Sequence, residues 1–341
     1  MPTVTLGKTG ITVDKNGFGA LPIQRASIDD AVLILRKALD NGITFFDTAR
    51  GYSNSEEKLG IAFEGKRDQV ILATKTPAKN AQDFWKDLET SLRLLKTDYV
   101  DILQFHNPVF CPKPEDGSGL YEAITEAKAQ GKVRFAGVTN HRFAVAKETV
   151  ESGLYEMLQF PLSYLSSAED EELIALCKQK QYGFLAMKAL SGGLITNAAA
   201  AYAYMSQFEN VLPIWGIQRE TELDDFIRFR ETPPQMTEDM IAEIAKDRRQ
   251  LSGSFCRGCG YCLPCPVNIE INMCARISLM LRRAPSASWL TESWQTKMQK
   301  IENCLECGRC TQHCPYHLDI PALLKVNLAD YQNVLAGRTK V

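Results

Sequence analysis

The feature that most constrains the fold of this chain is the alternation of short apolar runs with amphipathic stretches over its first 230 residues. Helical spacing of apolar residues over 28–41, 81–95, 121–130, 142–152 and 170–180 separates most of the apolar runs. Eight strand–helix units favour a parallel (β/α)8 barrel, and a doubly wound sheet is the alternative. The predicted strands lie near "NGFGALPI" and within "GITFFDT", "QVILATK", "VDILQFH", "VRFAGVTN", "YEMLQF", "YGFLAMK" and "VLPIWGI".

The rest of the chain divides by composition. Before the barrel, "VTLGKTGITV" predicts a hairpin that turns at Lys8, Thr9 and Gly10. After the two prolines in "RETPPQ", the stretch "TEDMIAEIAKDRRQL" predicts a linking helix. We therefore expect a barrel over residues 1–235, a linking helix over 236–251 and a smaller domain over 252–341.

Composition narrows the class of protein. A net charge of −2 argues against a general nucleic-acid binder. No apolar run reaches the roughly 18 residues of a membrane span, and "MPTVTLGKTG" lacks the features of a signal peptide. Nine of the eleven cysteines fall between Cys256 and Cys314. Two tight clusters of this kind favour metal-binding thiolates in a reducing compartment over disulfides, and we expect a cytoplasmic protein.

Polar residues end several of the apolar runs. Asp47, Lys75, His106 and Asn140 each lie at the C-terminal end of a predicted strand. Barrel enzymes place their chemistry at that end of the strands. Any one of these residues alone is better explained as a strand terminator, but together they predict a catalytic face.

The segments "FFDTARGY", "ATK" and "QFH", with "LGKTGITV", "GVTN" and "MLQF", resemble the aldo-keto reductase family over about residues 3–230. The resemblance implies an oxidoreductase that reduces a small carbonyl or oxidises the alcohol. It implies a catalytic tetrad of Asp47, Tyr52, Lys75 and His106. Tyr52 is then the proton donor, Lys75 lowers the pKa of Tyr52, Asp47 holds Lys75, and His106 donates a hydrogen bond to the substrate oxygen.

The family's cofactor is a nicotinamide nucleotide, usually NADPH, bound without the G-x-G-x-x-G motif, which is absent here. The resemblance implies that Thr139, Asn140 and Gln159 bind the carboxamide. It places the phosphates at the start of the helix after the eighth strand, where Arg219 would contact a 2′-phosphate. Three positions depart from the family pattern: Met187 replaces an aromatic residue, Glu222 a glutamine and Phe226 an asparagine. In the loop after His106, Phe110 and Cys111 are expected to line the substrate pocket.

The two cysteine runs indicate iron–sulfur chemistry. "CLECGRCTQHCP" has the bacterial ferredoxin spacing for 4Fe-4S ligands, and "CRGCGYCLPCP" is one residue shorter before its last cysteine. The helical sequence between the runs looks like an α-helical ferredoxin module, in which Cys274 is a buried apolar residue. Two structural zinc sites are the alternative. We predict two 4Fe-4S clusters with crossed ligands: Cys256, Cys259, Cys262 and Cys314 for one, and Cys304, Cys307, Cys310 and Cys265 for the other.

Three functions are compatible with this combination. In the first, the barrel is an NADP(H)-dependent carbonyl reductase and the clusters are structural or exchange electrons with a redox protein. In the second, single electrons pass from a redox partner to a substrate in the barrel, and nicotinamide binding is weakened or lost. In the third, the protein is not an enzyme but a redox-sensing binding module.

Overall fold

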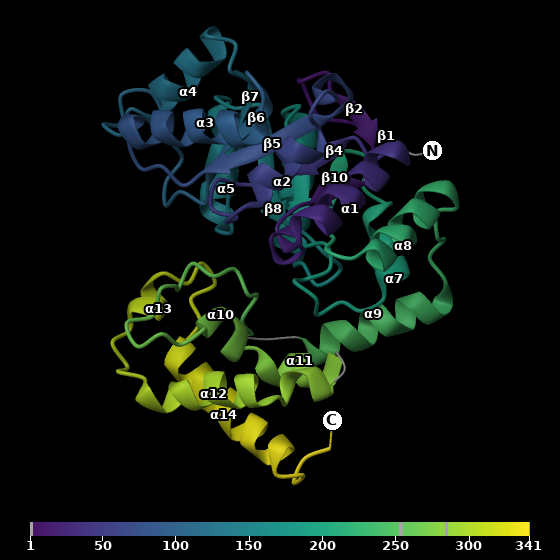
Figure 1. The fold of residues 1–341 in the computed structure, drawn as a ribbon, viewed down its shortest axis with the longest axis vertical. Helices are drawn as coiled ribbons and strands as arrows, with labels where there is room; N and C mark the ends of the chain where they lie inside the picture. Colours follow the sequence, from purple (N-terminus) through teal and green to yellow (C-terminus); the bar gives the residue numbers. More distant parts are fainter. Residues whose placement is uncertain (1–2, 252–254, 284–285, 341) are drawn as a thin grey trace. The chain divides into compact units, whose positions relative to one another are not determined.

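The computed structural model describes residues 3–251, 255–283 and 286–340 (Figure 1). By its internal contacts the chain divides into two units. The first, the barrel unit, comprises Met1–Ala189 and Ala198–Met240. The second, the C-terminal unit, comprises Leu190–Asn197 and Ile241–Val341. Each unit has its own architecture.

Eight parallel strands form a closed barrel in the first unit, with the last strand paired to the first. This confirms the predicted (β/α)8 barrel and excludes the doubly wound sheet, which would be open. Each of the eight strands falls within or overlaps one of the apolar runs of the sequence. Their bounds are β3 (Gly17–Gly19), β4 (Phe45–Asp47), β5 (Ile71–Thr76), β6 (Val100–His106), β7 (Val133–Thr139), β8 (Met157–Pro161), β9 (Gly183–Met187) and β10 (Val211–Gly216).

Helices follow the strands and surround the barrel (Figure 1). Three of them begin at a side chain that accepts a backbone N–H of the first turn: Ser27, Asn80 and Ser167. The bounds are η1 (Pro22–Arg25), α1 (Ile28–Asp40), α2 (Ser55–Ala62), η2 (Arg67–Gln69), α3 (Ala81–Leu95), α4 (Leu120–Ala129), α5 (Phe143–Ser152), α6 (Ala168–Gln179), α7 (Ala198–Met205) and α8 (Glu220–Glu231).

The N-terminal hairpin covers one end of the barrel. Strands β1 (Thr3–Thr5) and β2 (Thr12–Asp14) pair antiparallel around the predicted turn, where Gly10 has a φ of +72°. Apolar residues of the hairpin pack against barrel residues near the beginnings of several strands, among them Phe45, Met157 and Leu212. The chemistry must therefore lie at the opposite end, where the strands finish.

The C-terminal unit is helical. Helix α14 contacts α10, α11, α12 and α13, and it buries Ile320, Leu324 and Tyr331. Asn327 on the same helix donates to the carbonyl of Ala275 and accepts from the N–H of Ser278. The bounds are α9 (Glu238–Gln250), α10 (Ile271–Cys274), α11 (Ile277–Arg283), η3 (Ser286–Trp289), α12 (Glu292–Gln299), η4 (Lys300–Asn303), α13 (Arg309–Gln312) and α14 (Ile320–Leu335).

The division by contacts places two segments differently from the three-part prediction. The break falls inside α9, after Met240, and the loop Leu190–Asn197 that follows β9 belongs to the C-terminal unit. Within this unit, Asn197 donates to Glu243 of α9 over 2.5 Å. The predicted linking helix is thus part of a packed unit along most of its length.

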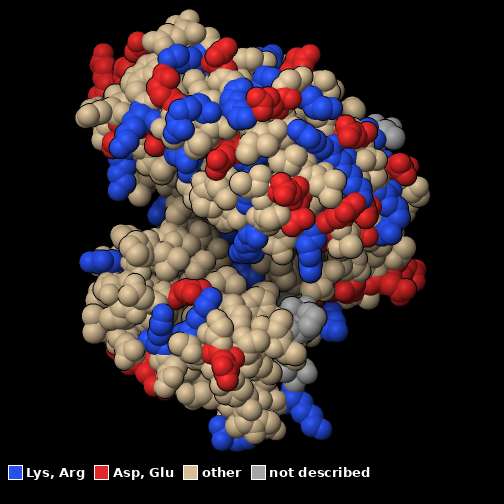
Figure 2. All heavy atoms as spheres, viewed as in Figure 1, with Lys and Arg blue, Asp and Glu red and all other residues tan. Residues whose placement is uncertain are grey.

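Charges on the barrel unit are mixed. On the face shown in Figure 2, basic and acidic side chains alternate over the barrel helices, and neither sign gathers in one area. Many of them form exposed pairs, such as Lys37 with Glu220. No helix in the described ranges has the length and apolarity needed to cross a membrane.

Candidate active site and iron–sulfur region

A buried ion pair lies at the C-terminal ends of two adjacent strands. Asp47 ends β4, and Lys75 lies near the end of β5, the next strand in the barrel. The ammonium nitrogen of Lys75 lies 2.8 and 2.7 Å from the two carboxylate oxygens of Asp47. Lys75 also donates to the carbonyl of Thr48 over 2.7 Å. All three protons of the ammonium group therefore have acceptors, and its position is fixed.

Tyr52 is held over this pair by a tight loop between β4 and α2. Its N–H donates to the carbonyl of Ala49, and its carbonyl accepts from the N–H of Ser55. The Ser55 hydroxyl bonds to Thr48 and donates to the carbonyl of Ala20. These bonds place the ring centroid of Tyr52 5.2 Å from the ammonium nitrogen of Lys75.

His106 completes the group from the end of β6. Its ring and that of Tyr52 meet edge to face, with centroids 5.7 Å apart and an interplanar angle of 82°. Tyr52 and His106 are half-buried, whereas Asp47 and Lys75 are buried. The structure thus brings the four predicted tetrad residues together, with two accessible rings above a buried ion pair.

The electrostatics differ from the sequence-based prediction in one respect. Burial, followed by the Asp47 carboxylate, raises the pKa of Tyr52 above its ordinary value of 10.0. The net direction is therefore opposite to the predicted lowering, because burial outweighs any stabilisation of the phenolate by the Lys75 ammonium group. The ammonium group of Lys75 is hydrogen-bonded to Asp47 and Thr48. The loss of water around the phenol has the largest effect on the pKa of Tyr52. The hydroxyl of Tyr52 stays protonated throughout the neutral range.

Burial also shifts the pKa values of the other three residues of the tetrad. It raises the pKa of Asp47 and lowers the pKa of Lys75, and the attraction between the two opposes both shifts. Burial and the charge of Lys75 lower the pKa of His106 to about 3. The imidazole is therefore neutral at physiological pH, with one N–H to donate.

The residues predicted to bind the nicotinamide carboxamide lie at or near the ends of the next strands. The side-chain amides of two of them are hydrogen-bonded to other groups of the protein. Asn140 donates to the carbonyl of Pro108 over 2.8 Å and accepts from the N–H of Arg142. Gln159 accepts from Gln104 over 3.2 Å, and a hydrogen bond from its side chain lowers the pKa of Asp47. Each amide keeps one lone pair or one hydrogen for a further bond, because a primary amide offers two of each.

Met187 and Thr139 lie side by side at this end of the barrel. The Thr139 hydroxyl is 3.8 Å from the Met187 sulfur, a weak contact that leaves the hydroxyl available to a stronger acceptor. A sulfur in this place can pack against an aromatic ring.

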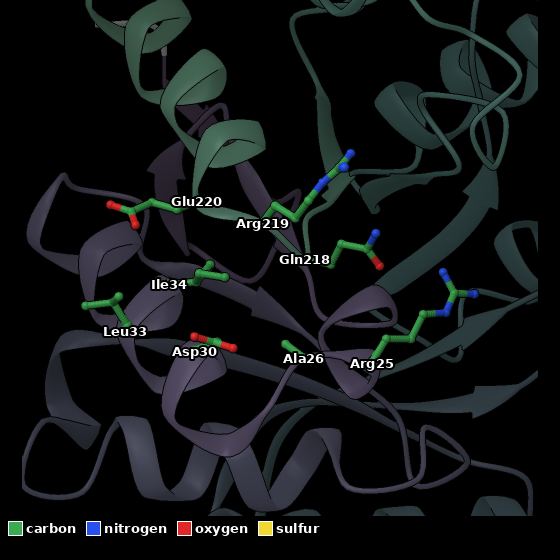
Figure 3. Close-up of a pocket in the computed structure, with 8 residues that line it drawn as sticks. All are labelled: Arg25, Ala26, Asp30, Leu33, Ile34, Gln218, Arg219 and Glu220. Carbon is green, nitrogen blue, oxygen red and sulfur yellow. The ribbon is translucent and has the colours of Figure 1, made fainter. Parts of the chain in front are cut away.

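A cavity of about 470 Å³ lies between the loop after β3 and the loop after β10. In Figure 3 the side chains of Arg25, Gln218 and Arg219 extend toward the same side of it. The buried amide oxygen of Gln218 has no hydrogen-bond partner among the described residues. Two guanidinium groups and two carboxylates, those of Asp30 and Glu220, line the cavity, and Glu220 is paired with Lys37, so the cavity is polar and the two arginines are its groups for an anion.

Glu222 occupies the place predicted for backbone–phosphate contacts. Its carboxylate accepts the N–H groups of Gln218 and Arg219 at the start of α8, and it accepts the Arg219 guanidinium over 2.6 Å. These N–H groups are therefore engaged by a carboxylate, which is a departure from the phosphate site implied by the resemblance. Phe226, the third departure, is buried and stacks on Trp215.

The loop after His106 separates its two predicted pocket residues. Phe110 is exposed, whereas Cys111 is buried and its sulfur lies 3.8 Å from the carbonyl of Pro112. Burial raises the pKa of the Cys111 thiol, so Cys111 is an apolar filler with little thiolate character.

The two cysteine runs lie in loops and short helices of the C-terminal unit. Cys256 is close enough to Cys259 and Cys314 for their charges to raise its pKa, after burial as the main cause. A small cavity is bordered by Cys262 and Cys265 of the first run and by Cys304, Cys307 and Cys310 of the second. Within the described ranges, no three His, Cys, Asp or Glu side chains converge on the position of a single metal ion. Thiolates of a 4Fe-4S cube bind four different irons, so their spacing is wider.

Two residues that lie in or beside the candidate site were not predicted from the sequence. Gln104 lies two residues before His106 and therefore on the same side of β6, where its amide orients Gln159. Strand alternation could have identified it. Arg25 lies in η1, with no motif, and only the folded chain brings it to the cavity that Arg219 also lines.

Comparisons with known proteins identify the families that the two parts of the chain resemble. A family model described as the aldo/keto reductase family matches residues 15–211, and one described as a 4Fe-4S dicluster domain matches residues 255–319. L-galactose dehydrogenase of Arabidopsis thaliana is 33% identical over 213 residues, which are 56% of this chain and 66% of that protein. Aldo-keto reductase YhdN of Bacillus subtilis (strain 168) is 32% identical over 219 residues, 58% of this chain and 64% of that protein.

Among solved structures, an aldo-keto reductase from Klebsiella pneumoniae in complex with NADPH superposes with a TM-score of 0.59. Its identity is 22%, and the match covers 72% of this chain and 94% of that one. The matched part spans just under two thirds of the two curated relatives. The barrel match covers more than half of the chain, and the chain therefore belongs to the aldo/keto reductase family, with a C-terminal region that matches a 4Fe-4S dicluster domain.

Proposed function

We propose that this protein is an oxidoreductase that interconverts a small carbonyl compound and its alcohol with NADP(H), with Tyr52 as proton donor. The observation that carries the proposal is the layered site: the accessible rings of Tyr52 and His106 lie over the buried Asp47–Lys75 pair. A pocket that only binds a ligand has no need of a buried lysine beside a tyrosine, so this arrangement disfavours a redox-sensing binding module.

The chain's own residues supply the proton and the electrostatic stabilisation. Reduction of a carbonyl builds negative charge on its oxygen. Tyr52, protonated because its pKa is raised, gives up its proton to that oxygen. The ammonium group of Lys75 then stabilises the phenolate that forms, and this attraction opposes the effect of burial, which raises the pKa of Tyr52. Neutral His106 donates an N–H to the same substrate oxygen.

NADP(H), when bound, supplies or accepts the hydride. We assign Arg25, Gln218 and Arg219 to its anionic end, because they line one polar cavity and two of them carry guanidinium groups. Thr139, Asn140 and Gln159 would use their remaining hydrogen-bonding positions for the carboxamide, and Met187 would pack against the ring. The similar aldo-keto reductase from Klebsiella pneumoniae was solved in complex with NADPH, and this likeness supports the choice of cofactor.

We further propose two 4Fe-4S clusters with crossed ligand sets. The proximity of Cys256 to Cys314 supports the first set, which also contains Cys259 and Cys262. A small cavity bordered by Cys265, Cys304, Cys307 and Cys310 supports the second, and Cys262 of the first set borders the same cavity. Eight thiolates satisfy two cubes, whereas structural zinc takes two ligands from each knuckle. The clusters stabilise the C-terminal unit or exchange electrons with a redox protein.

The test is made on full-length protein purified without air. We expect NADPH to bind, an aldehyde to be reduced, and Tyr52→Phe to lower turnover by at least 100-fold while NADPH binding persists. Tyr121→Phe, a change in another partly exposed tyrosine, is the matched control and should retain activity. Turnover by Tyr52→Phe at the rate of the unsubstituted protein would refute the role of Tyr52.

A second function is favoured by the engaged amides of Asn140 and Gln159 and by the carboxylate of Glu222 at the start of α8. In this alternative, single electrons from a redox partner reach the substrate and Tyr52 still provides the proton. A nicotinamide moves two electrons together and a 4Fe-4S cluster one. Protein that carries its clusters but binds neither NADPH nor NADH would support this alternative over the first.

A further inference from the structure

Arg276, between α10 and α11, is a buried cation for which the described residues provide no carboxylate partner. Its side chain lies in the C-terminal unit and is 4% exposed. One terminal nitrogen donates to the carbonyl of Gly192 over 2.5 Å and lies 3.1 Å from the sulfur of Met280. Its Nε has no hydrogen-bond partner among the described residues. Burial of a charge is costly unless it is paired, so this guanidinium is expected to be balanced by a negative group close by.

Two glycines make room for the guanidinium. Gly258 and Gly192 both have left-handed backbones, with φ of +64° and +65°. A side chain at Gly258 would overlap the terminal nitrogen of Arg276, and one at Gly192 would come within 3.0 Å of it. The space is therefore reserved for the guanidinium by two backbone positions far apart in the sequence.

The cysteines of the first run lie beside this space and would supply the negative charge. Gly258, against which the guanidinium lies, donates its N–H to the sulfur of Cys256 over 3.4 Å. Burial lowers the pKa of Arg276, and the charge of Cys256 opposes that shift. Cys256 belongs to the proposed ligand set with Cys259, Cys262 and Cys314, and a cube held by four thiolates is anionic.

We infer that Arg276 is the internal counter-ion of the cluster bound by Cys256, Cys259, Cys262 and Cys314, and that it raises the reduction potential of this cluster more than that of the other. This inference rests on the proposed clusters. Reduction adds one negative charge to the cluster. A buried guanidinium stabilises the reduced form more than the oxidised form, because net charge and hydrogen bonding set the potentials of such clusters.

The same side chain joins the cluster to the loop Leu190–Asn197. That loop belongs to the C-terminal unit by its contacts, yet it follows β9, the strand that ends at Met187. Arg276 is thus a positioning residue for Gly192 as well as a counter-ion for the cluster.

The test is a redox titration of the full-length protein, followed by the electron paramagnetic resonance of each cluster. The signal lost in Cys314→Ala identifies the first cluster. In Arg276→Gln, we expect the ratio of reduced to oxidised first cluster to fall at least tenfold at a fixed potential, or about 59 mV for a one-electron couple. The second cluster should shift less. Arg282→Gln, an exposed arginine paired with Asp330, is the control and should move neither.

Arg276→Lys keeps the positive charge, so the reduction potential of the first cluster should stay close to that of the unsubstituted protein. An unchanged potential in an iron-replete Arg276→Gln protein would overturn the inference, and so would equal shifts of both clusters. If Arg276→Gln loses its iron, the comparison with Arg276→Lys decides. Iron retained by the lysine variant supports the counter-ion, and iron lost from both assigns Arg276 to packing alone. Absence of iron from the unsubstituted protein would instead refute the proposed clusters.

Discussion

The ammonium group of Lys75 lies within 2.8 Å of both carboxylate oxygens of Asp47, in a place where neither side chain is exposed. A buried pair of this kind adds little net stability while intact, but removal of one partner leaves a bare charge. Lys75→Met should therefore lower the free energy of unfolding by about 3 to 5 kcal/mol and abolish turnover. Urea unfolding and an aldehyde reduction assay measure the two effects.

The double variant Lys75→Met with Asp47→Asn separates the two effects. It removes both charges, so it should recover part of the lost stability while it remains inactive. Lys113→Met breaks an exposed pair with Glu148 and should leave the free energy of unfolding nearly unchanged, because water screens such a pair. A double variant less stable than Lys75→Met alone would show that the pair does not act as a coupled unit.

His106 gives a prediction about pH. Its pKa is about 3 in the folded protein and 6.5 when unperturbed. As pH falls below 6.5, the unfolded chain takes up a proton that the folded protein accepts only near pH 3. The free energy of unfolding should therefore decrease as pH falls from 6.5 toward 3, and His106→Gln should remove this contribution. Thermal unfolding of both proteins across that range measures the difference.

The same shift applies to catalysis. With a neutral imidazole as the hydrogen-bond donor, kcat/KM for reduction should show no inflection near pH 6.5. An inflection at that pH that disappears in His106→Gln would mean that the imidazole titrates in the folded protein, contrary to its burial.

The sequence was sufficient to predict the barrel and to predict that the four tetrad residues lie close together. Apolar runs that end in polar residues identify strands, and parallel strands bring those ends to one face. Helices α2 and α7 were not predicted because neither has an amphipathic period: α2 buries Lys58, and α7 is apolar on all sides. The raised pKa of Tyr52 was also beyond a sequence pattern, because desolvation depends on everything packed around the phenol.

Arg219 and Arg228 offer a matched pair for the cofactor. Both lie on or next to α8, both are exposed, and each pairs with a carboxylate three residues away. Only Arg219 lines the cavity with Arg25. Arg219→Gln should weaken NADPH binding at least tenfold and NADH binding much less, since only NADPH carries a 2′-phosphate. Arg228→Gln should change neither dissociation constant in a fluorescence titration. Equal weakening of both cofactors by Arg219→Gln would assign this arginine to another part of the nucleotide.

The crossed ligand sets predict which cysteine substitutions remove the same cluster. Cys314 lies in the second run, but its charge acts on Cys256 of the first. Cys314→Ala and Cys256→Ala should therefore remove the same paramagnetic signal, and Cys265→Ala should remove the one that Cys304→Ala removes. The iron content of each variant should fall from about eight to about four irons per chain.

Cys274→Ala is the control: this thiol is buried, and its sulfur lies 3.9 Å from the carbonyl of Lys297, so all the iron should remain. If Cys314→Ala instead removes the signal that Cys304→Ala removes, each run binds its own cluster and the crossed assignment is wrong.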